Sequence, residues 1–363
     1  ILAQLGAEVT SVAMPKMLDP LLAWFAGGAA KKIIMSTVYA GKKSVFLNFK
    51  KEEGRRLILK MAARSDIFVE SFRAGALEKI GLGYRDLSKV NPKIIYCSIS
   101  GYGQTGPYRR RGSHDINYMA LSGFLSMLAR RDADPVLPPV PMGDLAGGSL
   151  LAVIAILAAL WERRKSGKGQ YLDTSILDGL FSMMFLPYAA LMREKEDYAG
   201  CLETTGRDPF YCVYPAADGR FLAVGAVESL SRSLLLRLTG REDLAAASCD
   251  QARWEDVRGE LRRTFQKKTM KEWADIFEGQ EACVSPVLTI REALVNPQLI
   301  ARGRARRRRP GPALPGHPFS FSRSRPRRGL YPERIGQHTL SVLRALGLSA
   351  RQIQDLRRRR VIV

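Results

Sequence analysis

Short runs of β-branched residues alternate with helical patterns in the first half of the chain, and this alternation constrains the fold more than any other feature. Strand-like runs occur at Glu8–Met14, Ser44–Phe49, Asp66–Glu70 and Lys93–Ser100. Apolar residues at helical spacing fill 52–65, and 76–92 has the pattern of a helix, a glycine break and a second helical turn. Strands that alternate with helices favour a parallel sheet with helical crossovers. We therefore predict an α/β fold with a Rossmann-like large domain.

The second half of the chain predicts a smaller α+β domain. Residues 165–176 end a helix at a glycine and run into a fifth strand, and a methionine-rich helical stretch follows to about Arg193. Residues 209–228 have the two strands and the Asp-Gly turn of a hairpin, followed by helical segments. Residues 337–359 have the pattern of a helix, a glycine stop and a second helix capped by Ser349. The expected organisation is a large domain at 1–175 and 318–363, a connector at 176–208, a small domain at 209–295 and an Arg/Pro-rich linker at 296–317.

Two features bear on the compartment. The apolar run Leu145–Trp161 is at the short limit for a membrane span, but Asp144 precedes it and Glu162–Lys165 follows it, so we interpret it as a buried helix and predict no membrane span. Five cysteines lie far apart with no C-x-x-C, which indicates neither disulfides nor a zinc site. We expect a cytoplasmic protein without a metal. The chain opens on Ile1 in mid-pattern, so a further N-terminal segment is expected.

The net charge of +22 is unevenly distributed. Residues 301–363 hold 17 arginines and two acids, a net +15, which leaves +7 for the first 300 residues. A modestly basic surface suits an anionic ligand such as a phosphorylated cofactor. The arginine-rich tail lacks the regular aromatic residues of a single-strand binder and any nucleic-acid reading motif. We therefore favour a solvated arginine surface over nucleic-acid binding.

The stretch GYGQTG, Gly101–Gly106, matches the G-x-G-x-x-G of dinucleotide-binding loops and follows a predicted strand. A phosphate-binding helix should start directly after such a loop, but Pro107 and three arginines stand there instead. The glycines therefore predict a bend at the carboxyl end of a strand. Such a bend can line the crevice where open α/β sheets bind ligands.

Four separate motifs resemble a known family. They are SHDINYMALSG at 113–123, GDLAGG at 143–148, AVGAVE at 223–228 and EACVSPVL at 281–288. Together they resemble the α-methylacyl-CoA racemases of the family III CoA-transferase (CaiB/BaiF-like) superfamily. The resemblance also takes in 69–108 and 335–349, so it covers nearly the whole chain in order. It implies an acyl-CoA enzyme of lipid metabolism, either a racemase (an isomerase) or a transferase.

His114 and Asp144 are a neutral-pH base and a carboxylate, each after a glycine-rich turn. To move a proton between the two faces of one carbon, an acid and a base must stand on opposite sides of it and exchange roles. Their ordinary pKa values are about 6.5 and about 3.9, so burial would have to bring them closer. The backbone N–H groups of Leu145–Gly147, at a helix N-terminus, could stabilise the oxygen of a thioester enolate, each contributing about 3 kcal/mol.

The resemblance implies roles for these residues. In the racemases the acid/base pair is a His and an Asp in these motifs, which match His114 and Asp144, and a Glu ending the AVGA-x-E hairpin matches Glu228. In the transferases the Asp matching Asp144 is a nucleophile that carries the acyl group as an anhydride and then CoA as a thioester. SHDINY together with AVGAVE favours epimerisation of a 2-methylacyl-CoA, because a transferase requires only the Asp.

Structural roles are the alternatives for each of these residues. A lone His in a loop is more often structural than catalytic, and Asp144 before an apolar helix could be an N-cap. Glu228 could be an exposed hairpin end, and Asp115 is expected to orient His114 or the local backbone. A third possibility for the whole chain is a binding protein without catalysis that acts through its arginine tail.

The resemblance places the CoA contacts on loops after the early strands. The matching residues are Leu47, Lys50, Ser71, Phe72, Arg73 and Lys79. Cationic side chains suit the CoA phosphates and Phe72 could pack on adenine, although each Lys or Arg alone could belong to a solvated face. The chain departs from the family at 17–24, where an arginine is missing, at Ala74 and Ser113, which replace proline and glycine, and at 229–233.

Family resemblance also implies an assembly. The relatives form interlocked homodimers whose active site uses the large domain of one subunit and the small domain of the other. Glu228 would then approach the site from the partner chain. No tightly bound cofactor is expected, because coenzyme A enters as part of the substrate.

Overall fold

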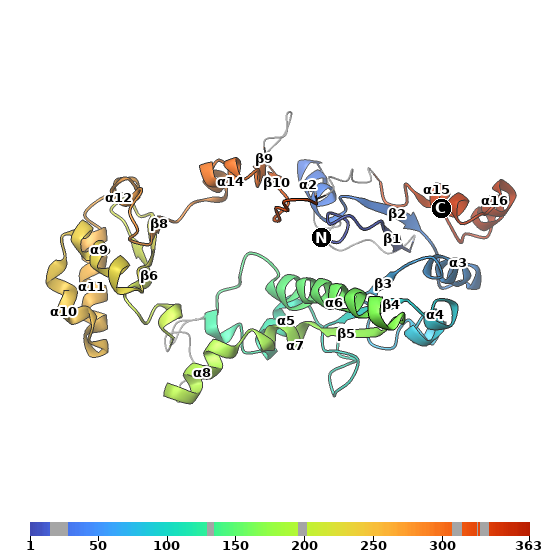
Figure 1. Ribbon diagram of the computed structural model, residues 1–363, viewed down its shortest axis with the longest axis horizontal. Coiled ribbons are helices and arrows are strands. Elements are labelled where there is room, and N and C mark those ends of the chain that lie inside the picture. The colour runs from blue at the N-terminus through green and yellow to red at the C-terminus, as the bar shows by residue number, and fades with distance from the viewer. Residues whose placement is uncertain (15–27, 129–133, 195–201, 307–313, 325, 327–333) are drawn as a thin grey trace. The chain divides into compact units, whose positions relative to one another are not determined.

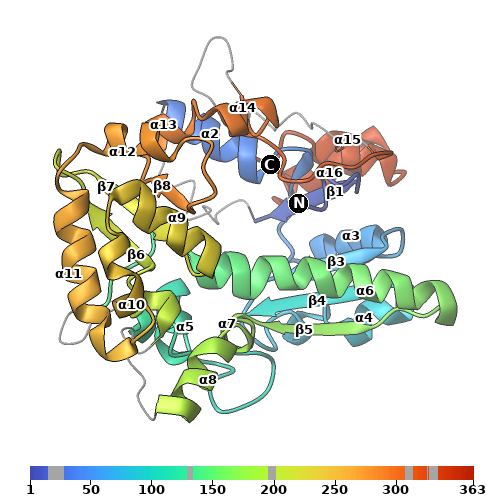
Figure 2. The ribbon, with the colours of Figure 1, turned by 60° about the vertical axis from the view of Figure 1, so that its left-hand side comes forward.

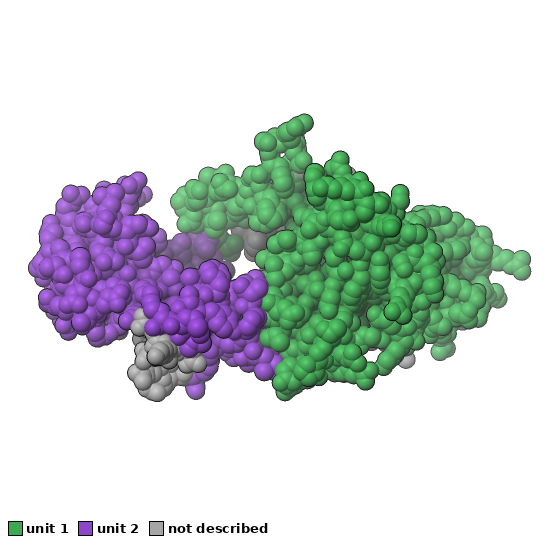
Figure 3. All heavy atoms as spheres, turned by 60° about the horizontal axis from the view of Figure 1, so that its bottom comes forward, with its two compact units in different colours: residues 1–114, 142–179, 294–363 green, residues 115–141, 180–293 purple. Residues whose placement is uncertain are grey.

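The computed structural model describes residues 1–14, 28–128, 134–194, 202–306, 314–324, 326 and 334–363. The chain divides into two compact units (Figure 3). The first unit contains residues 1–114, 142–179 and 294–363, and the second contains 115–141 and 180–293. The domain boundaries expected from the sequence stay a prediction.

The strands of the first unit are parallel, as the alternating pattern predicts (Figure 1). β1 (Val9–Ala13) pairs with β2 (Lys42–Phe46), and β4 (Ile95–Ser100) pairs with β3 (Ile67–Glu70) on one side and β5 (Tyr171–Ser175) on the other. The crossovers contain α2 (Gly28–Val38), α3 (Glu52–Ala62) and α4 (Tyr84–Val90). The mixed α/β architecture with parallel sheets is therefore confirmed.

The segment 76–92 differs from its predicted pattern. Its first part is only a 3₁₀ turn, Glu78–Ile80, which ends at Gly81 in the left-handed region (φ 73°). The α-helix follows the glycine instead of preceding it. Pro92 lies just beyond this helix, which ends one residue earlier at the Asn91 C-cap because the residue before a proline disfavours helical backbone.

Alternate residues of β4 face two different parts of the core, because side chains of a strand alternate between its faces. Tyr96 is fully buried and stacks on Phe68 at 5.1 Å between ring centroids, in a cluster shared with α3 and α4. Cys97 faces the other way and packs against Ala152 and Ile156 of the long apolar helix. That helix lies along β4 and β5 (Figure 2).

The apolar run forms a π-helical segment, Gly143–Leu150, that continues into α6 (Leu151–Ser166). By length and composition this 24-residue helix could cross a membrane, but one side packs on the sheet as in a core helix. The expectation of a buried helix is wrong for the single chain, since only 33% of the most apolar 18-residue stretch of this helix is buried. The sheet covers one side, and Ile154 and Trp161 are 61% and 63% exposed.

The C-terminal helices complete the first unit. α15 (Thr339–Ala345) docks on β2, where the Phe46 N–H donates to Thr339 Oγ1 (2.9 Å) and the Ser44 N–H donates to His338 Nδ1 (3.1 Å). α16 (Ala350–Arg358) starts with the predicted Ser349 N-cap, whose hydroxyl accepts from the Gln352 N–H. His338 therefore has a structural role.

The second unit contains the predicted hairpin. β6 (Tyr211–Pro215) and β7 (Phe221–Gly225) are antiparallel, and β8 (Val284–Pro286), which the sequence did not indicate, adds a third strand. Its core centres on Phe265, whose ring stacks on Tyr214 at 5.1 Å. The helices of this unit are α5 (Asp115–Leu121), α8 (Phe185–Glu194), α9 (Ser229–Thr239), α10 (Ala245–Ser248), α11 (Trp254–Phe265), α12 (Met270–Phe277) and α13 (Ile290–Ala293).

Four further elements belong to segments that the sequence assigned to the connector and the linker. α7 (Ile176–Ser182) follows β5 directly, with no irregular connector between them. In the linker, α14 (Pro297–Ala301) precedes a short antiparallel pair, β9 (Ala305–Arg306) and β10 (Leu314–Pro315). The remainder of the predicted connector at 195–201 and the arginines at 307–309 lie outside the described residues.

Candidate active site

The neighbouring strands β4 and β5 carry polar residues that the sequence did not single out. Asp173 of β5 accepts the Gln104 N–H through Oδ2 (2.9 Å), and the Gln104 side-chain amide donates to Ser98 Oγ of β4 (2.8 Å). Gly103 takes φ 78°, which requires glycine at this bend. The GYGQTG stretch is therefore the predicted bend, held to the sheet by Asp173 and Ser98. A sharper sequence signal would have been the polar residues inside these strands, Ser98 in β4 and Asp173 in β5.

The segment after β3 carries three of the predicted CoA residues. The Phe72 N–H donates to Glu70 Oε2 (2.7 Å), and the Phe72 ring meets Phe49 edge to face at 6.0 Å. Ser71 and Arg73, on either side of Phe72, are exposed. Phe72 therefore anchors the segment, while its two neighbours point polar groups toward solvent.

The other three predicted CoA residues differ in accessibility. The Leu47 side chain is fully buried in the core, so any contact it makes with a ligand has to come from its backbone. Lys50 is exposed, and its N–H donates to Asn48 Oδ1 (3.2 Å) in the turn that precedes α3. Lys79 is exposed in the 3₁₀ turn after the Phe72 segment.

His114 lies in an exposed stretch between the GYGQTG bend and α5. The Arg73 guanidinium packs close to this stretch, because a Cβ added at Gly112 would lie 3.0 Å from Arg73 Nη2. A predicted CoA residue and the approach to the predicted base therefore lie side by side in the first unit. This proximity follows from the fold and was not visible in the sequence.

Asp144 is exposed in the first turn of the π-helical segment. Met142 is the N-cap, with helical backbone and no side-chain bond, so the N-cap interpretation of Asp144 is wrong. In a π-helix each N–H bonds the carbonyl five residues earlier, so the Gly147 N–H bonds the carbonyl of the N-cap Met142, and the N–H groups of Leu145 and Ala146 precede the first such bond. π-Helical turns often occur at functional sites.

The glycines of GDLAGG set the position of this turn. A Cβ at Gly179 of α7 would collide with the Gly147 carbonyl oxygen, and one at Gly148 would lie 3.0 Å from Ile176 Cγ1 and 3.6 Å from Ile99 Cγ2. The turn that carries Asp144 therefore packs directly on the carboxyl ends of β4 and β5. In open parallel sheets that edge is where ligands bind.

Glu228 belongs to the second unit. It ends the β7 hairpin, as predicted, and is also the N-cap residue of α9 (φ −78°, ψ 149°). The Ser231 hydroxyl lies 3.0 Å from the Glu228 carbonyl oxygen and 3.3 Å from Oε2. Ser231 is one of the residues of 229–233 that depart from the family pattern, and it holds the Glu228 carboxylate locally.

Burial affects the acids and phenols near the sheet edge. Desolvation raises the pKa of Glu70 above its usual range, although hydrogen bonds from Ser98 and the Phe72 N–H oppose this. Burial also raises the pKa of Tyr171 to about 12. No group of three or more His, Cys, Asp and Glu side chains within the described residues is arranged to hold a metal ion.

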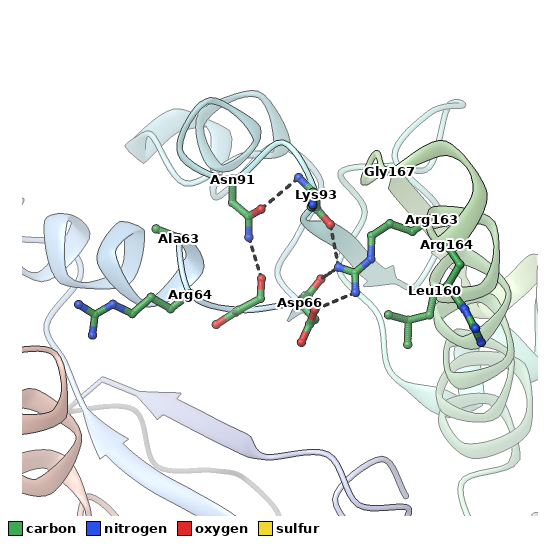
Figure 4. Close-up of a pocket in the computed structure, with 10 residues that line it drawn as sticks. Ala63, Arg64, Asp66, Asn91, Lys93, Leu160, Arg163, Arg164 and Gly167 are labelled. Carbon is green, nitrogen blue, oxygen red and sulfur yellow. Dashed lines mark hydrogen bonds and ion pairs between the residues drawn. The ribbon is translucent and has the colours of Figure 1, made fainter.

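A cavity of about 640 Å³ lies at the opposite, amino-terminal edge of β3 and β4 (Figure 4). Arg163 spans it, donating to Asp66 Oδ1 (2.7 Å) and to the Lys93 carbonyl (2.9 Å). Asn91 donates to the Ala62 and Ser65 carbonyls at the end of α3. Three helix C-termini converge here, and cations at such ends complement the helix dipoles. We interpret this cavity as a structural joint.

Comparisons with known proteins agree on one family. The family model CoA-transferase family III matches residues 1–339. The chain is 37% identical to an α-methylacyl-CoA racemase of Mus musculus, over 89% of this chain and 85% of that protein. It is 33% identical to the Homo sapiens racemase (100% and 92%) and 30% identical to the Homo sapiens succinyl-CoA:glutarate CoA-transferase (94% and 80%).

The fold comparison gives the same result. A CaiB/BaiF family protein from Brucella suis superposes with a TM-score of 0.81 at 25% identity, over 95% of this chain and 93% of that one. Sequence and fold agree over almost the full length. The chain belongs to CoA-transferase family III.

Proposed function

We propose that this family III enzyme is an α-methylacyl-CoA racemase, which epimerises the α-carbon of a 2-methyl-branched acyl-CoA. The observation that carries the proposal is that the chain contains SHDINY as well as GDLAGG. Exchange of a proton on both faces of the α-carbon requires a second acid/base group in addition to the Asp. The racemases of mouse and man, at 37% and 33% identity, support it.

In the proposed mechanism, His114 and Asp144 are the two proton carriers. One removes the α-proton, the thioester becomes an enolate, and the other returns a proton to the opposite face. Of the N–H groups of Leu145–Gly147 predicted to stabilise the enolate oxygen, those of Leu145 and Ala146 precede the first π-helical bond and take this role, which suits donors at a helix start. Glu228, which the family resemblance includes in the racemase site, would approach this site from the partner chain of a dimer.

We place the CoA part of the substrate along the loops after β2 and β3. Arg73 and Lys79 face the phosphates, with Lys50 beside them, and Phe72 packs on the adenine. The exposed positions of these cations support this assignment. Leu47, whose side chain is buried, contributes its backbone. CoA is part of the substrate, and proton transfer needs no resident cofactor.

Transfer of CoA between a thioester and a carboxylic acid is the second candidate function. The observation that favours it is the exposed carboxylate of Asp144, which is accessible to an acyl carbon. It would attack the thioester carbonyl to form a mixed anhydride and release the CoA thiolate. The thiolate then attacks the aspartyl carbonyl of the anhydride, which expels the donor acid as a carboxylate and leaves an aspartyl CoA thioester. The acceptor carboxylate attacks this thioester, and the same steps in reverse release the acceptor as its CoA thioester and restore Asp144. The similarity to the human succinyl-CoA:glutarate CoA-transferase supports this alternative.

We further propose that the protein is a homodimer of two interlocked chains. The support is the exposed apolar surface of the long helix, where Leu150, Ile154, Leu157 and Trp161 are 46–63% exposed. Contiguous apolar surface of this kind marks an interface. In the dimer, Glu228 of one chain would serve the site of the other.

The described cysteines remain thiols, which supports a reducing, cytoplasmic location.

The test is deuterium incorporation at C2 of a 2-methylacyl-CoA in deuterated water, with and without an acceptor acid. A racemase incorporates deuterium without the acid. A transferase turns over only when the acid is added and leaves C2 unlabelled. A protein that neither exchanges nor transfers, but binds nucleic acid in a salt-dependent way, would support the binding-protein alternative.

A further inference from the structure

Glu70 is a partly buried acid that the proposed mechanism does not use. It is the last residue of β3 and stands opposite Ser98 of β4 in the parallel register. An ionisable group is costly to bury, so its retention there requires compensating contacts. The contacts of Glu70 point to two loops, both of which carry proposed functional residues.

The first contact fixes the segment that follows the strand. Glu70 Oε2 accepts the Phe72 N–H at 2.7 Å, two residues along the chain. This bond turns the backbone so that Phe72 packs on Phe49 while Ser71 and Arg73 are exposed. Without an acceptor at this place, the Phe72 N–H loses its partner, and the segment keeps the packing of the Phe72 ring on Phe49 and the backbone bond from the Ala76 N–H to the Arg73 carbonyl.

The second contact joins this segment to the GYGQTG bend. The Ser98 side chain is the register neighbour of Glu70 and acts to lower the pKa of its carboxyl group. Ser98 Oγ also accepts from the Gln104 amide (2.8 Å), and the Gln104 N–H donates to Asp173 Oδ2 (2.9 Å). A row of neighbouring polar side chains therefore crosses β3, β4 and β5, with Glu70 and Asp173 on either side of Ser98 in the strand register. It links the loop of Arg73 to the loop that leads to His114.

We propose that Glu70 is a positioning residue, which acts as a hydrogen-bond acceptor to hold the Phe72–Arg73 segment in the form that binds the CoA part of the substrate. The inference rests on the proposed function, because it takes the ligand of this segment to be CoA. The close approach of Arg73 to Gly112 extends the effect, since displacement of Arg73 also disturbs the stretch before His114.

The experiment measures the dissociation constant of coenzyme A itself by calorimetry, on the full chain and without turnover. Glu70→Ala removes the acceptor, and we expect the constant to rise at least about 10-fold, as for loss of one bond to a charged group. Glu70→Gln keeps an acceptor oxygen for the Phe72 N–H, so the constant should stay within about 3-fold of the unaltered protein. Glu70→Met, which fills the same space, replaces the alanine variant if that one does not fold.

Asp66→Ala is the matched control, because it removes a carboxylate just before the other end of the same strand and breaks its ion pair with Arg163. If Glu70→Ala weakens binding only by destabilising the strand, Asp66→Ala should weaken it as well. If Glu70 positions the segment, the dissociation constant of coenzyme A for Asp66→Ala should stay within about 2-fold of the value for the unaltered protein. Equal weakening by Glu70→Ala and Asp66→Ala, or equal weakening by Glu70→Ala and Glu70→Gln, would overturn the proposal. If the unaltered protein does not bind coenzyme A, the proposed function fails as well. If it binds and Glu70→Ala binds equally well, only the positioning role fails.

Discussion

At the scale of single residues, the surroundings of Glu70 explain how a partly buried acid is accommodated next to the exposed side chains of Ser71 and Arg73. Glu70 meets Ser98 and the Phe72 N–H, and the charge of Glu78 faces it from the next turn, with the phenols of Tyr96 and Tyr171 on the neighbouring strands. The effect of desolvation on the pKa of Glu70 is larger than the opposing effect of the hydrogen bonds. The neutral carboxyl form is therefore more favoured in the folded protein than it is in water.

This environment makes a prediction about stability and pH. The folded pKa of Glu70 lies above its ordinary value of 4.5, so its contribution to stability is full below pH 4.5 and is lost as pH rises through the folded pKa. Glu70→Gln does not titrate. We expect its free energy of unfolding, measured by urea denaturation between pH 4 and 8, to improve relative to the unaltered protein as pH rises. A difference that stays constant across this range would contradict the assignment.

At the scale of elements, close packing between the π-helical segment and α7 positions Asp144. Gly147 and Gly179 allow the two backbones to touch, and Gly148 faces Ile176. The two glycines that end the GDLAGG motif are therefore required for packing, in addition to the proposed chemical role of its Asp. A side chain at the contact would separate the turn from the carboxyl ends of β4 and β5.

Gly179→Ala tests this packing. The new methyl group would collide with the Gly147 carbonyl, and overpacking of this kind costs about 1–3 kcal/mol of unfolding free energy. Activity should fall more than stability, because Asp144 moves with the turn. Gly259→Ala in the half-buried middle of α11 is the control, where only the Arg263 side chain lies near and alanine should stabilise by about 0.5–1 kcal/mol. Equal effects of the two variants on stability would argue against a special contact at Gly179.

The elements also show how far sequence reasoning reached. The five parallel strands, the hairpin and the Ser349 cap could be predicted because each has a local signal in periodicity or turn residues. β8 has only three residues, too few for a periodic pattern. Burial of α6 was predicted wrongly, since hydropathy reports an apolar helix but not whether one chain supplies neighbours for all its sides.

The candidate site was accessible from the sequence only in part. Motifs selected His114, Asp144 and Glu228, whose roles stay a prediction. Contacts between segments distant in the chain, such as Arg73 with Gly112 and Asp173 with Gln104, have no local signature. They depend on how parallel strands align their carboxyl ends, which only the folded chain reveals.

At the scale of the whole molecule, the uncovered apolar side of α6 predicts a concentration-dependent dimer. Ile154→Glu would bury a charge in each copy of a two-fold interface, which is strongly unfavourable without a partner. Sedimentation equilibrium should show the dimer dissociation constant raised at least about 100-fold. Lys165→Glu introduces the same side chain at the exposed end of the helix and should leave assembly unchanged. A dimer that tolerates Ile154→Glu, or a monomeric unaltered protein, would contradict the interface.

The central claim is that His114 and Asp144 exchange protons with opposite faces of one α-carbon. The most direct measurement follows deuterium at C2 separately for the two pure epimers of a 2-methylacyl-CoA, with His114→Ala and Asp144→Ala compared to the unaltered enzyme. We predict that neither variant inverts the centre, and that each still exchanges one epimer only, the opposite one in the two variants. Inversion that survives either substitution, or exchange of the same epimer by both variants, would contradict the two-base account.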